Sequence, residues 1–443
     1  MIRGGVGMAI SVKLQPQDNE RKKVLISSIL FMGLGHILYL KQYLKGLFYA
    51  SIEIIVLIFL PKIIKVISAL RTLGEPQPHL PIRERANSIF MLIDGVIVLA
   101  VILFFIAVYV ISVRSALTDY DEARTTPKSI EEGLNKAFPI LGLAPGVGLV
   151  AFFVIVPLIF SACVAFTNYS SPGHIPPNNT VDWVGFDNFA ALFGGHAVWA
   201  GALGRVALWT LTWGALATAT CYFGGMLMAV VLKDSGLRIA PIFKMIFILP
   251  YAVPSVISML VWQNLLNGTF GTINRTLSAV GLISKSIPWL GDPWLAKFTA
   301  VMVNLWAGFP YFMLLTFGSM TAISQDIYEA ALIDGAGKFQ VFKKITLPIV
   351  LYQTAPLIIM SFTHNINNFG AIFFLTGGKP VVADSTITSA GGTDILVTWI
   401  YKLTVNLLKY HYASVLAVMI FIVLAPLAVF NLRRTKSFRE GEL

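Results

Sequence analysis

The sequence predicts an all-α polytopic membrane protein, and three observations support this fold class. Of the 443 residues, 56% are apolar and only 12% are charged, and the mean hydropathy is +0.76, which is far from the usual soluble composition. The apolar residues gather in long runs, and a helix needs about 20 such residues to cross a bilayer. Eight runs meet this length: 47–66, 89–113, 138–166, 203–232, 241–264, 295–320, 349–370 and 412–432.

These eight predicted spans divide into an N-terminal extension and a six-span core. Residues 1–113 hold an N-terminal cytoplasmic tail and two spans, 114–137 form a charged cytoplasmic connector, and 138–432 form the core. The basic tail 433–443 follows.

A further apolar run at 24–40 is shorter and is interrupted by Gly33, Gly35 and His36. It suits an interfacial or re-entrant hairpin better than a full crossing.

The distribution of Lys and Arg predicts the orientation in the membrane. These residues lie mostly at the ends of apolar runs, so the positive-inside effect explains the net charge of +11 and no nucleic-acid partner is needed. The C-terminal tail is basic and 167–204 contains no Lys or Arg, which places the tail inside and the ordered loop 167–202 outside. The 67–88 connection conflicts with this scheme, because alternation of the spans places it outside while its arginines favour the inside.

No residues for catalysis, a cofactor or a metal stand out. Cys163 and Cys221 lie inside apolar runs, where they act as small hydrophobic residues rather than disulfide partners or thiolate ligands. The sequence also lacks a Gly-x-x-x-x-Gly-Lys-Ser/Thr motif and a His-Glu-x-x-His motif. We therefore expect the chain not to be an enzyme and not to bind ATP itself.

Polar residues inside a span are costly and usually face a cavity or the interior of a helix bundle. In the run 349–370, the spacing of Ser361, His364, Asn365 and Asn368 places them on one face of a helix. The preceding run offers Gly308 and the ring and hydroxyl of Tyr311. Such a mixture suits a sugar, which needs partners for its hydroxyls and a flat apolar surface. Interhelical hydrogen bonding is an equally good explanation of these residues.

A polar island lies between the runs 295–320 and 349–370, and its residues predict two short helical segments. Ser324 and Asp326 are good helix-starting residues, and Asp326 with Glu329 has the spacing of a capping box before a helix over 327–334. Glu329 could also simply cap its own helix.

The second half of the island predicts the end of that helix and a return to the membrane. Gly335 and Gly337 can adopt the left-handed conformation that ends a helix, and a second amphipathic turn carries Phe339 and Phe342. Pro348 suits the first turn of the next span.

This island resembles the cytoplasmic EAA loop of the permease subunits of bacterial ABC importers. The matching positions are Glu329, Ala330, Ala331, Asp334, Gly335, Ala336, Phe342, Ile345, Leu347 and Pro348. The resemblance implies that the loop 321–348 docks on a separate ATPase subunit through Glu329, Ala330, Ala331, Asp334 and Gly335, and that ATP is bound by that partner.

Other segments resemble the larger permease subunit of maltose and maltodextrin importers. They are 165–171, 183–189, 367–369, 375–378, 390–397 and 431–435. The resemblance implies a type I six-helix permease core with substrate contacts at Gly308, Tyr311, Ser361, Asn365 and Asn368. His364 is a departure, because an aromatic ring is typical of the family at that position; its imidazole can still stack on a sugar or bond a hydroxyl, and a proton-coupling role is the alternative.

The expected partners are therefore a second homologous permease, two copies of the ATPase subunit, an extracellular or periplasmic sugar-binding protein and membrane lipid. We expect a multi-pass protein of the bacterial inner membrane, with a cytoplasmic C-terminus, that imports maltose or malto-oligosaccharides by alternating access. The alternatives are a galacto-oligosaccharide or raffinose-type substrate, or an ion-coupled secondary transporter. The last is disfavoured because the predicted spans hold few acidic residues.

Overall fold

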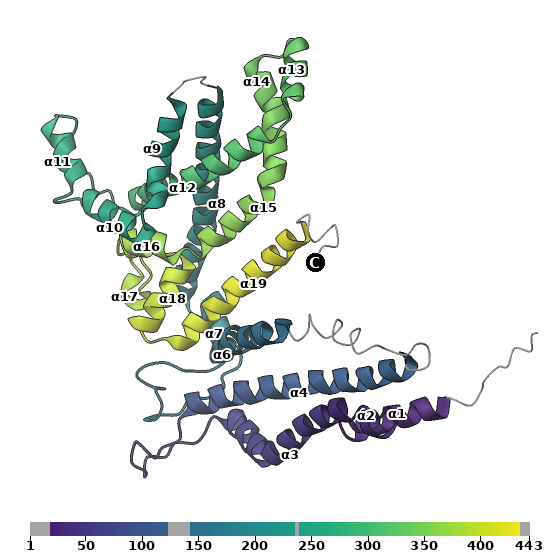
Figure 1. The fold of residues 1–443 in the computed structure, drawn as a ribbon. Coiled ribbons are helices and arrows are strands. Elements are labelled where there is room, and N and C mark those ends of the chain that lie inside the picture. Colours follow the sequence, from purple (N-terminus) through teal and green to yellow (C-terminus); the bar gives the residue numbers. More distant parts are fainter. Residues whose placement is uncertain (1–17, 123–141, 235–238, 435–443) are drawn as a thin grey trace, which may run out of the picture. The chain divides into compact units, whose positions relative to one another are not determined.

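The computed structural model describes residues 18–122, 142–234 and 239–434 (Figure 1). These residues form helices joined by turns and irregular loops, and they contain no β-strand, so the all-α prediction is confirmed. They form two compact units. The N-terminal unit holds residues up to 163 and the segment 175–183, and the core unit holds 164–174 and the residues from 184 onward. Residues 1–17, 123–137 and 435–443 of the predicted tails and connector lie outside the described residues.

Seven helices are long and apolar enough to cross a membrane, and a bent pair provides an eighth candidate span. Together they match all eight predicted runs. The long helices are Tyr43–Thr72, Ser88–Asp121, Gly142–Val164, Ala197–Lys233, Pro293–Thr321, Lys338–Ile366 and Tyr410–Arg433, and the bent pair is Ala240–Ala252 with Ser255–Leu265.

The helices carry the following labels in Figure 1. In the N-terminal unit they are α1 (Asp18–Leu30), α2 (Leu34–Leu38), α3 (Tyr43–Thr72), α4 (Ser88–Glu122) and, ending at the boundary between the units, α6 (Val156–Val164), which follows a π-helical turn at Ala151–Ile155. The core unit holds α7 (Asp187–Ala190), α8 (Ala197–Asp234), α9 (Ala240–Ala252), α10 (Ser255–Leu265), α11 (Thr272–Ala279), α12 (Pro293–Thr321), α13 (Gln325–Ile333), α14 (Lys338–Val341), α15 (Leu347–Ile366), α16 (Phe369–Thr376), α17 (Ser385–Thr388), α18 (Leu396–Val405) and α19 (Tyr410–Arg434).

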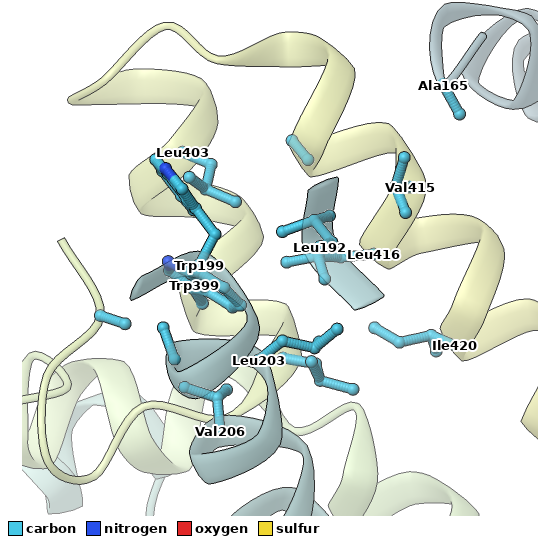
Figure 2. Close-up of a cluster of buried hydrophobic side chains, with 14 of the residues drawn as sticks. Ala165, Leu192, Trp199, Leu203, Val206, Trp399, Leu403, Val415, Leu416 and Ile420 are labelled. Carbon is cyan, nitrogen blue, oxygen red and sulfur yellow. The ribbon is translucent and has the colours of Figure 1, made fainter. Parts of the chain in front are cut away.

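Two boundaries differ from the prediction. Helix α4 continues beyond residue 113 through the first part of the predicted connector. The second half of the predicted ordered loop 167–202 is helical, because α7, a π-helical turn at Ala191–Gly195 and the start of α8 lie there. Burial explains this difference: Leu192 is fully buried and Trp199 stacks on Trp399 of α18, with ring centroids 6.3 Å apart (Figure 2).

The predicted span 241–264 is broken rather than straight. Helices α9 and α10 meet at an angle of 91°. Pro254 restricts the residue before it to an extended conformation, and Val253 has φ −85° and ψ 133°. This proline therefore ends α9 and allows α10 to begin in a new direction.

The run 24–40 forms a helical hairpin. The chain enters it and leaves it near the C-terminal end of α4. Near the start of α1, Arg21 pairs with Asp121, and near its end the carbonyl of Ile29 accepts a bond of 2.7 Å from the hydroxyl of Tyr109. After the turn, Lys45 at the start of α3 pairs with Asp119 at 2.6 Å. Both arms thus reach the same end of α4; the re-entrant or interfacial placement of this hairpin stays a prediction.

At its other end the N-terminal unit includes part of the loop that was predicted to be external. The backbone N–H of Val181 donates to the Ser88 hydroxyl at 3.1 Å, and the indole of Trp183 donates to the carbonyl of Leu70 at 3.0 Å. The 67–88 connection therefore lies beside 175–183, an arrangement that alternation of the spans predicts. Arg85 serves a local purpose, because its guanidinium donates to the carbonyls of Leu80 and Pro78.

Helices α8 and α12 form the centre of the core unit. A side chain at Gly225 of α8 would meet backbone atoms of α12 at 2.6 Å, and one at Gly308 of α12 would meet the Cys221 sulfur at 2.7 Å. Glycine therefore allows the two backbones to approach closely. A second packing layer joins α8, α18 and α19 through the cluster in Figure 2.

Candidate functional site

A cavity of about 670 Å³ lies in the core unit between the break of α9 and α10, helix α12 and the end of α15. We call it the substrate cavity, because it contains the residues that the sequence predicts for substrate binding. All six residues that the sequence predicted for substrate binding line it: Gly308, Tyr311, Ser361, His364, Asn365 and Asn368. The structure thus brings together residues from two predicted spans.

Asn368 lines this cavity from a different element than the sequence predicted. Helix α15 ends at Ile366, so Asn368 does not share a helical face with Ser361 and His364. It is instead the N-cap of α16, where its side-chain oxygen accepts a bond of 3.2 Å from the N–H of Ala371. Asparagine competes with the backbone for hydrogen bonds and so favours a new helix start over a continuous helix.

Asn365 both lines the cavity and joins two helices. Its side chain is 6% exposed and lines the cavity, but its amide nitrogen donates to the hydroxyl of Thr218 on α8 at 3.0 Å. Its backbone carbonyl accepts a bond from the Trp213 indole, also on α8. Part of this residue therefore holds α15 to α8.

Tyr311 and His364 are the predicted residues that are most open to the cavity. Both side chains are exposed, and no hydrogen-bond partner of either is found among the described residues. Tyr311 faces a second ring, Tyr251 at the end of α9, with centroids 6.2 Å apart. These two rings offer apolar faces and hydroxyl groups on one side of the cavity.

Sequence reasoning missed several lining residues, above all Tyr251, Ser258 and Asn304. Ser258 on α10 is 5% exposed, and its hydroxyl has no partner among the described residues. Pro250 and Pro254 were the available signal, because two prolines so close together in a predicted span indicate a break. Broken helices occur in membranes where they line a cavity.

The described residues that line the substrate cavity include no Asp, Glu, Lys or Arg. Its polar groups are hydroxyls, amides, a thiol and one imidazole. An uncharged ligand with many hydroxyls matches such a lining, whereas a phosphate or carboxylate ligand would lack a cationic partner.

The predicted docking loop begins with a different cap from the one expected. Ser324 is the N-cap of α13 and its hydroxyl accepts a bond of 3.3 Å from the N–H of Asp326. Asp326 therefore lies within the first turn, and the predicted capping box between Asp326 and Glu329 is wrong. The acidic side chain still suits the positive end of the helix dipole.

The two glycines of the loop have separate tasks. Gly335 has φ +77° and ends α13 as predicted, whereas Gly337 has φ −71° and is the N-cap of α14. From Lys338 the helix continues through a π-helical turn at Phe342–Thr346 into α15. Pro348 is the second residue after that turn; since it has no N–H to donate, it disfavours regular helical bonding there.

Four of the predicted docking residues, Glu329, Ala330, Asp334 and Gly335, are exposed, while Ala331 is buried at 9% exposure. Ala331 packs inward instead of facing a partner. Three apolar side chains that were not predicted as docking residues are conspicuously exposed: Leu332, Ile333 and Phe339, at 62%, 86% and 74%. Large apolar side chains exposed in this way are candidates for contact with a partner.

The loop is attached to the ends of two core helices. Lys233 of α8 donates to the carbonyl of Met320 at the end of α12 at 2.9 Å, and its ammonium lies 4.6 Å from the centre of the Tyr328 ring. The Tyr328 hydroxyl lies 3.3 Å from that of Thr346. These contacts connect α13 to the ends of α8 and α12.

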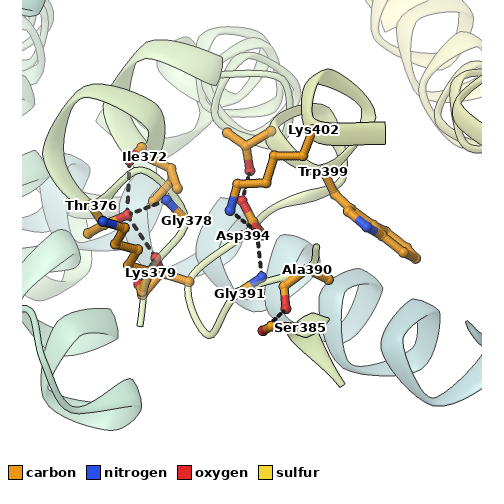
Figure 3. A network of polar contacts seen from close by, with 12 residues as sticks. Ile372, Thr376, Gly378, Lys379, Ser385, Ala390, Gly391, Asp394, Trp399 and Lys402 are labelled. Carbon is orange, nitrogen blue, oxygen red and sulfur yellow. Dashed lines mark hydrogen bonds and ion pairs between the residues drawn. The ribbon is translucent and has the colours of Figure 1, made fainter. Parts of the chain in front are cut away.

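At the other end of α12, residues 377–395 form what we call the Asp394 loop. The Asp394 carboxylate is fully buried and accepts bonds from the Gly391 N–H, the Thr398 hydroxyl and the Lys402 ammonium, at 2.6, 2.8 and 2.6 Å (Figure 3). Arg205 of α8 adds an ion pair of 2.8 Å with Asp384. The loop is thus fixed by paired charges.

Comparison with known proteins agrees with this architecture. Residues 222–435 match the family of binding-protein-dependent transport system inner membrane components. The chain is 35% identical to the galactooligosaccharides transport system permease protein GanP of Bacillus subtilis, over 95% of this chain and 99% of that protein. It is 34% identical to the maltodextrin transport system permease protein MalC of Streptococcus pneumoniae, over 95% and 98%.

A solved structure shares the fold. A bacterial ABC transporter involved in the import of the acidic polysaccharide alginate aligns with 70% of this chain and 100% of its own, with a TM-score of 0.55 and 22% identity. The predicted type I permease core is thus confirmed. The chain belongs to the binding-protein-dependent transport system inner membrane components and is the membrane-spanning permease component of a sugar ABC importer.

Proposed function

We propose that this chain forms part of the translocation path of an ATP-driven importer for neutral oligosaccharides, with malto-oligosaccharides as the preferred substrate. The observation that carries the proposal is the lining of the substrate cavity, which combines amides, hydroxyls and two tyrosine rings without an ionised side chain among the described lining residues. Its volume of about 670 Å³ is in the usual range for a ligand site.

In this proposal ATP is bound and hydrolysed by two copies of a separate ATPase subunit, which dock on the exposed surface around Glu329 and Ile333. A second homologous permease completes the path, and an external or periplasmic binding protein delivers the sugar. The docking loop then faces the cytoplasm, the segment 167–202 faces the outside, and the described structure lies in the inner membrane.

Under this proposal the docking loop acts on the cavity through α12. Movement of α13 is transmitted through Tyr328 and Lys233 to the end of α12, and α12 carries Gly308 and Tyr311 in the cavity wall. Binding of nucleotide to the ATPase would thus favour one of two arrangements of the cavity, outward or inward. His364 would act as a neutral partner of a sugar hydroxyl.

The test is uptake of labelled oligosaccharide by the complete complex in vesicles, together with binding-protein-stimulated ATP hydrolysis. Removing the Tyr311 hydroxyl with Tyr311→Phe, or the imidazole with His364→Ala, should each remove about one hydrogen bond to sugar, a loss of roughly two- to tenfold in apparent affinity. ATP hydrolysis should change much less. Met302→Leu, on an exposed surface of α12 outside the cavity lining, is the matched control.

Asn365→Leu should behave differently, because it also removes the hydrogen bond to Thr218. We expect lower stability and a parallel loss of uptake and ATP hydrolysis. Unchanged uptake in assembled Tyr311→Phe and His364→Ala complexes would remove this cavity from the substrate path.

A galacto-oligosaccharide is the second candidate substrate, favoured by the 35% identity to the galactooligosaccharide permease. Competition between unlabelled malto- and galacto-oligosaccharides for uptake distinguishes the two. Stronger competition by the galacto-oligosaccharide would overturn the preference for malto-oligosaccharides.

A further inference from the structure

A second cavity, of about 690 Å³, lies at the other end of α10 from the break. We call it the outer cavity. Gln263 and Asn264 line it from the end of α10, Asn267 and Phe270 from the loop that follows, and Thr376 and Lys379 from the end of α16 and beyond. It is distinct from the substrate cavity, with which it shares no lining residue.

The two cavities lie in series along one pair of helices. Helices α10 and α16 pack against each other. Ser258 and Ala371 line the substrate cavity near the starts of these helices, while Asn264 and Thr376 line the outer cavity near their ends. Less than two turns of α10, roughly 9 Å, separate Ser258 from Asn264. An oligosaccharide of a few units is long enough to reach both.

The wall of the outer cavity is held in place by one buried amide. Asn274, 5% exposed, donates to the Ser286 hydroxyl at 2.8 Å and to the carbonyl of Ile287 at 2.9 Å, and its oxygen accepts a bond of 3.0 Å from the Trp289 indole. The Asn267 oxygen accepts bonds from the N–H groups of the next turn. The polar lining is therefore organised before any ligand arrives.

Several groups in this lining have hydrogen-bonding capacity or apolar surface that the fold itself does not use. The amide of Gln263 has no hydrogen-bond partner among the described residues. Asn264 donates only to the carbonyl of Leu260 in its own helix, at 2.9 Å, which leaves its side-chain oxygen available. The Phe270 ring is 62% exposed at the edge of the cavity. Amides and an exposed ring suit the hydroxyls and the apolar face of a sugar.

We propose that the outer cavity is an auxiliary saccharide subsite, which holds the trailing units of a neutral oligosaccharide while its leading units occupy the substrate cavity. This inference rests on the proposed function and adds a selection for chain length. The only charged residue in the described lining is Lys379, which is exposed, and a single exposed ammonium is weak support for an anionic ligand.

The direct test is protection of a cysteine from a thiol reagent. Thr269→Cys, in the loop before α11, places a thiol in the lining, and Ser284→Cys, in the loop after α11, places one outside it. The complete transporter is labelled without the binding protein, so that docking does not shield the loop, and the labelling of the parent is subtracted. We expect a long malto-oligosaccharide to slow labelling at Thr269→Cys several-fold and to leave Ser284→Cys unchanged. Equal labelling with and without the sugar would overturn the subsite.

Uptake gives the second measurement. Gln263→Ala or Asn264→Ala should raise the apparent KM for a long malto-oligosaccharide by about two- to tenfold, the loss of one hydrogen bond, and leave the KM for maltose unchanged. Equal effects on both sugars in an assembled complex would indicate a structural role and refute the subsite. Failure of the parent complex to transport any saccharide would refute the proposed function, and the subsite with it.

Discussion

The docking loop and the Asp394 loop lie at opposite ends of α12 and are stabilised by different interactions. The docking loop follows Thr321 at the end of this helix, whereas Gly392 of the Asp394 loop packs close to Pro293 at its start. The Asp394 loop buries a charged pair and satisfies it within the fold. The docking loop leaves Ile333 and Phe339 exposed and relies on local caps.

This difference shows that one loop of the chain is held rigid, whereas the other leaves a surface available to a partner. A buried charge must be fully paired, so the segments that pair it cannot move independently. An exposed apolar surface gains stability only when a partner covers it. The first arrangement suits a fixed frame beside the cavities, and the second suits a surface completed by another subunit.

The largest expected effect is on the Asp394 loop. Asp394→Ala leaves the Lys402 ammonium, 13% exposed, without its partner, and breaking a buried pair in this way costs about 3–5 kcal/mol. We expect a lower thermal unfolding midpoint and poor yield of the purified protein. Asp394→Leu with Lys402→Met, which removes both charges, should recover part of the loss. A change below about 1 kcal/mol, as for a surface pair, would show that this loop is not held by the buried charge.

A smaller effect is expected at the start of α13. Ser324→Ala removes the N-cap bond to Asp326, which costs about 1 kcal/mol of helix stability. Hydrogen exchange of the α13 amides should accelerate while exchange in the Asp394 loop stays unchanged. Ser324→Asp keeps a capping oxygen and should retain the slow exchange; equally fast exchange in both variants would contradict the cap.

The smallest effect on stability is expected on the exposed docking surface. Ile333→Glu should change the free energy of unfolding by no more than about 0.5 kcal/mol, since the side chain is 86% exposed. Recovery of the ATPase subunit with the purified chain should nevertheless fall sharply. Val381→Glu on the Asp394 loop, where Val381 is 70% exposed, is the matched control and should leave recovery unchanged. Normal recovery with Ile333→Glu would place the ATPase contact elsewhere.

The structure also separates residues that the sequence treated as one group. Ser361, His364, Asn365 and Asn368 were predicted as one helical face, and all four line the cavity. Asn368 caps α16 and Asn365 binds Thr218, so their amides are partly committed to the fold. Tyr311 and His364 have no such commitment among the described residues, which makes them the cleaner tests of substrate contact.

The sequence alone determined the all-α class, the eight apolar runs and the helix end at Gly335 in the loop 321–348, whose docking role stays a prediction. These features depend on local composition, because a bilayer requires about 20 apolar residues for each crossing and a helix end requires particular residues such as Gly335. The convergence of two polar segments on one cavity also followed from the cost of polar side chains in a membrane.

Only the tertiary structure decided where the runs break and which residues meet across them. The turn at Val253 and the new helix start at Asn368 place Tyr251 and Ser258 in the cavity wall, and no property of a single run predicts that meeting. The position of 67–88 beside 175–183 was likewise decided by bonds to Val181 and Trp183, more than 90 residues away in sequence. Composition reports the average environment of a segment, whereas contacts between distant segments depend on packing and hydrogen bonding that only the folded chain creates.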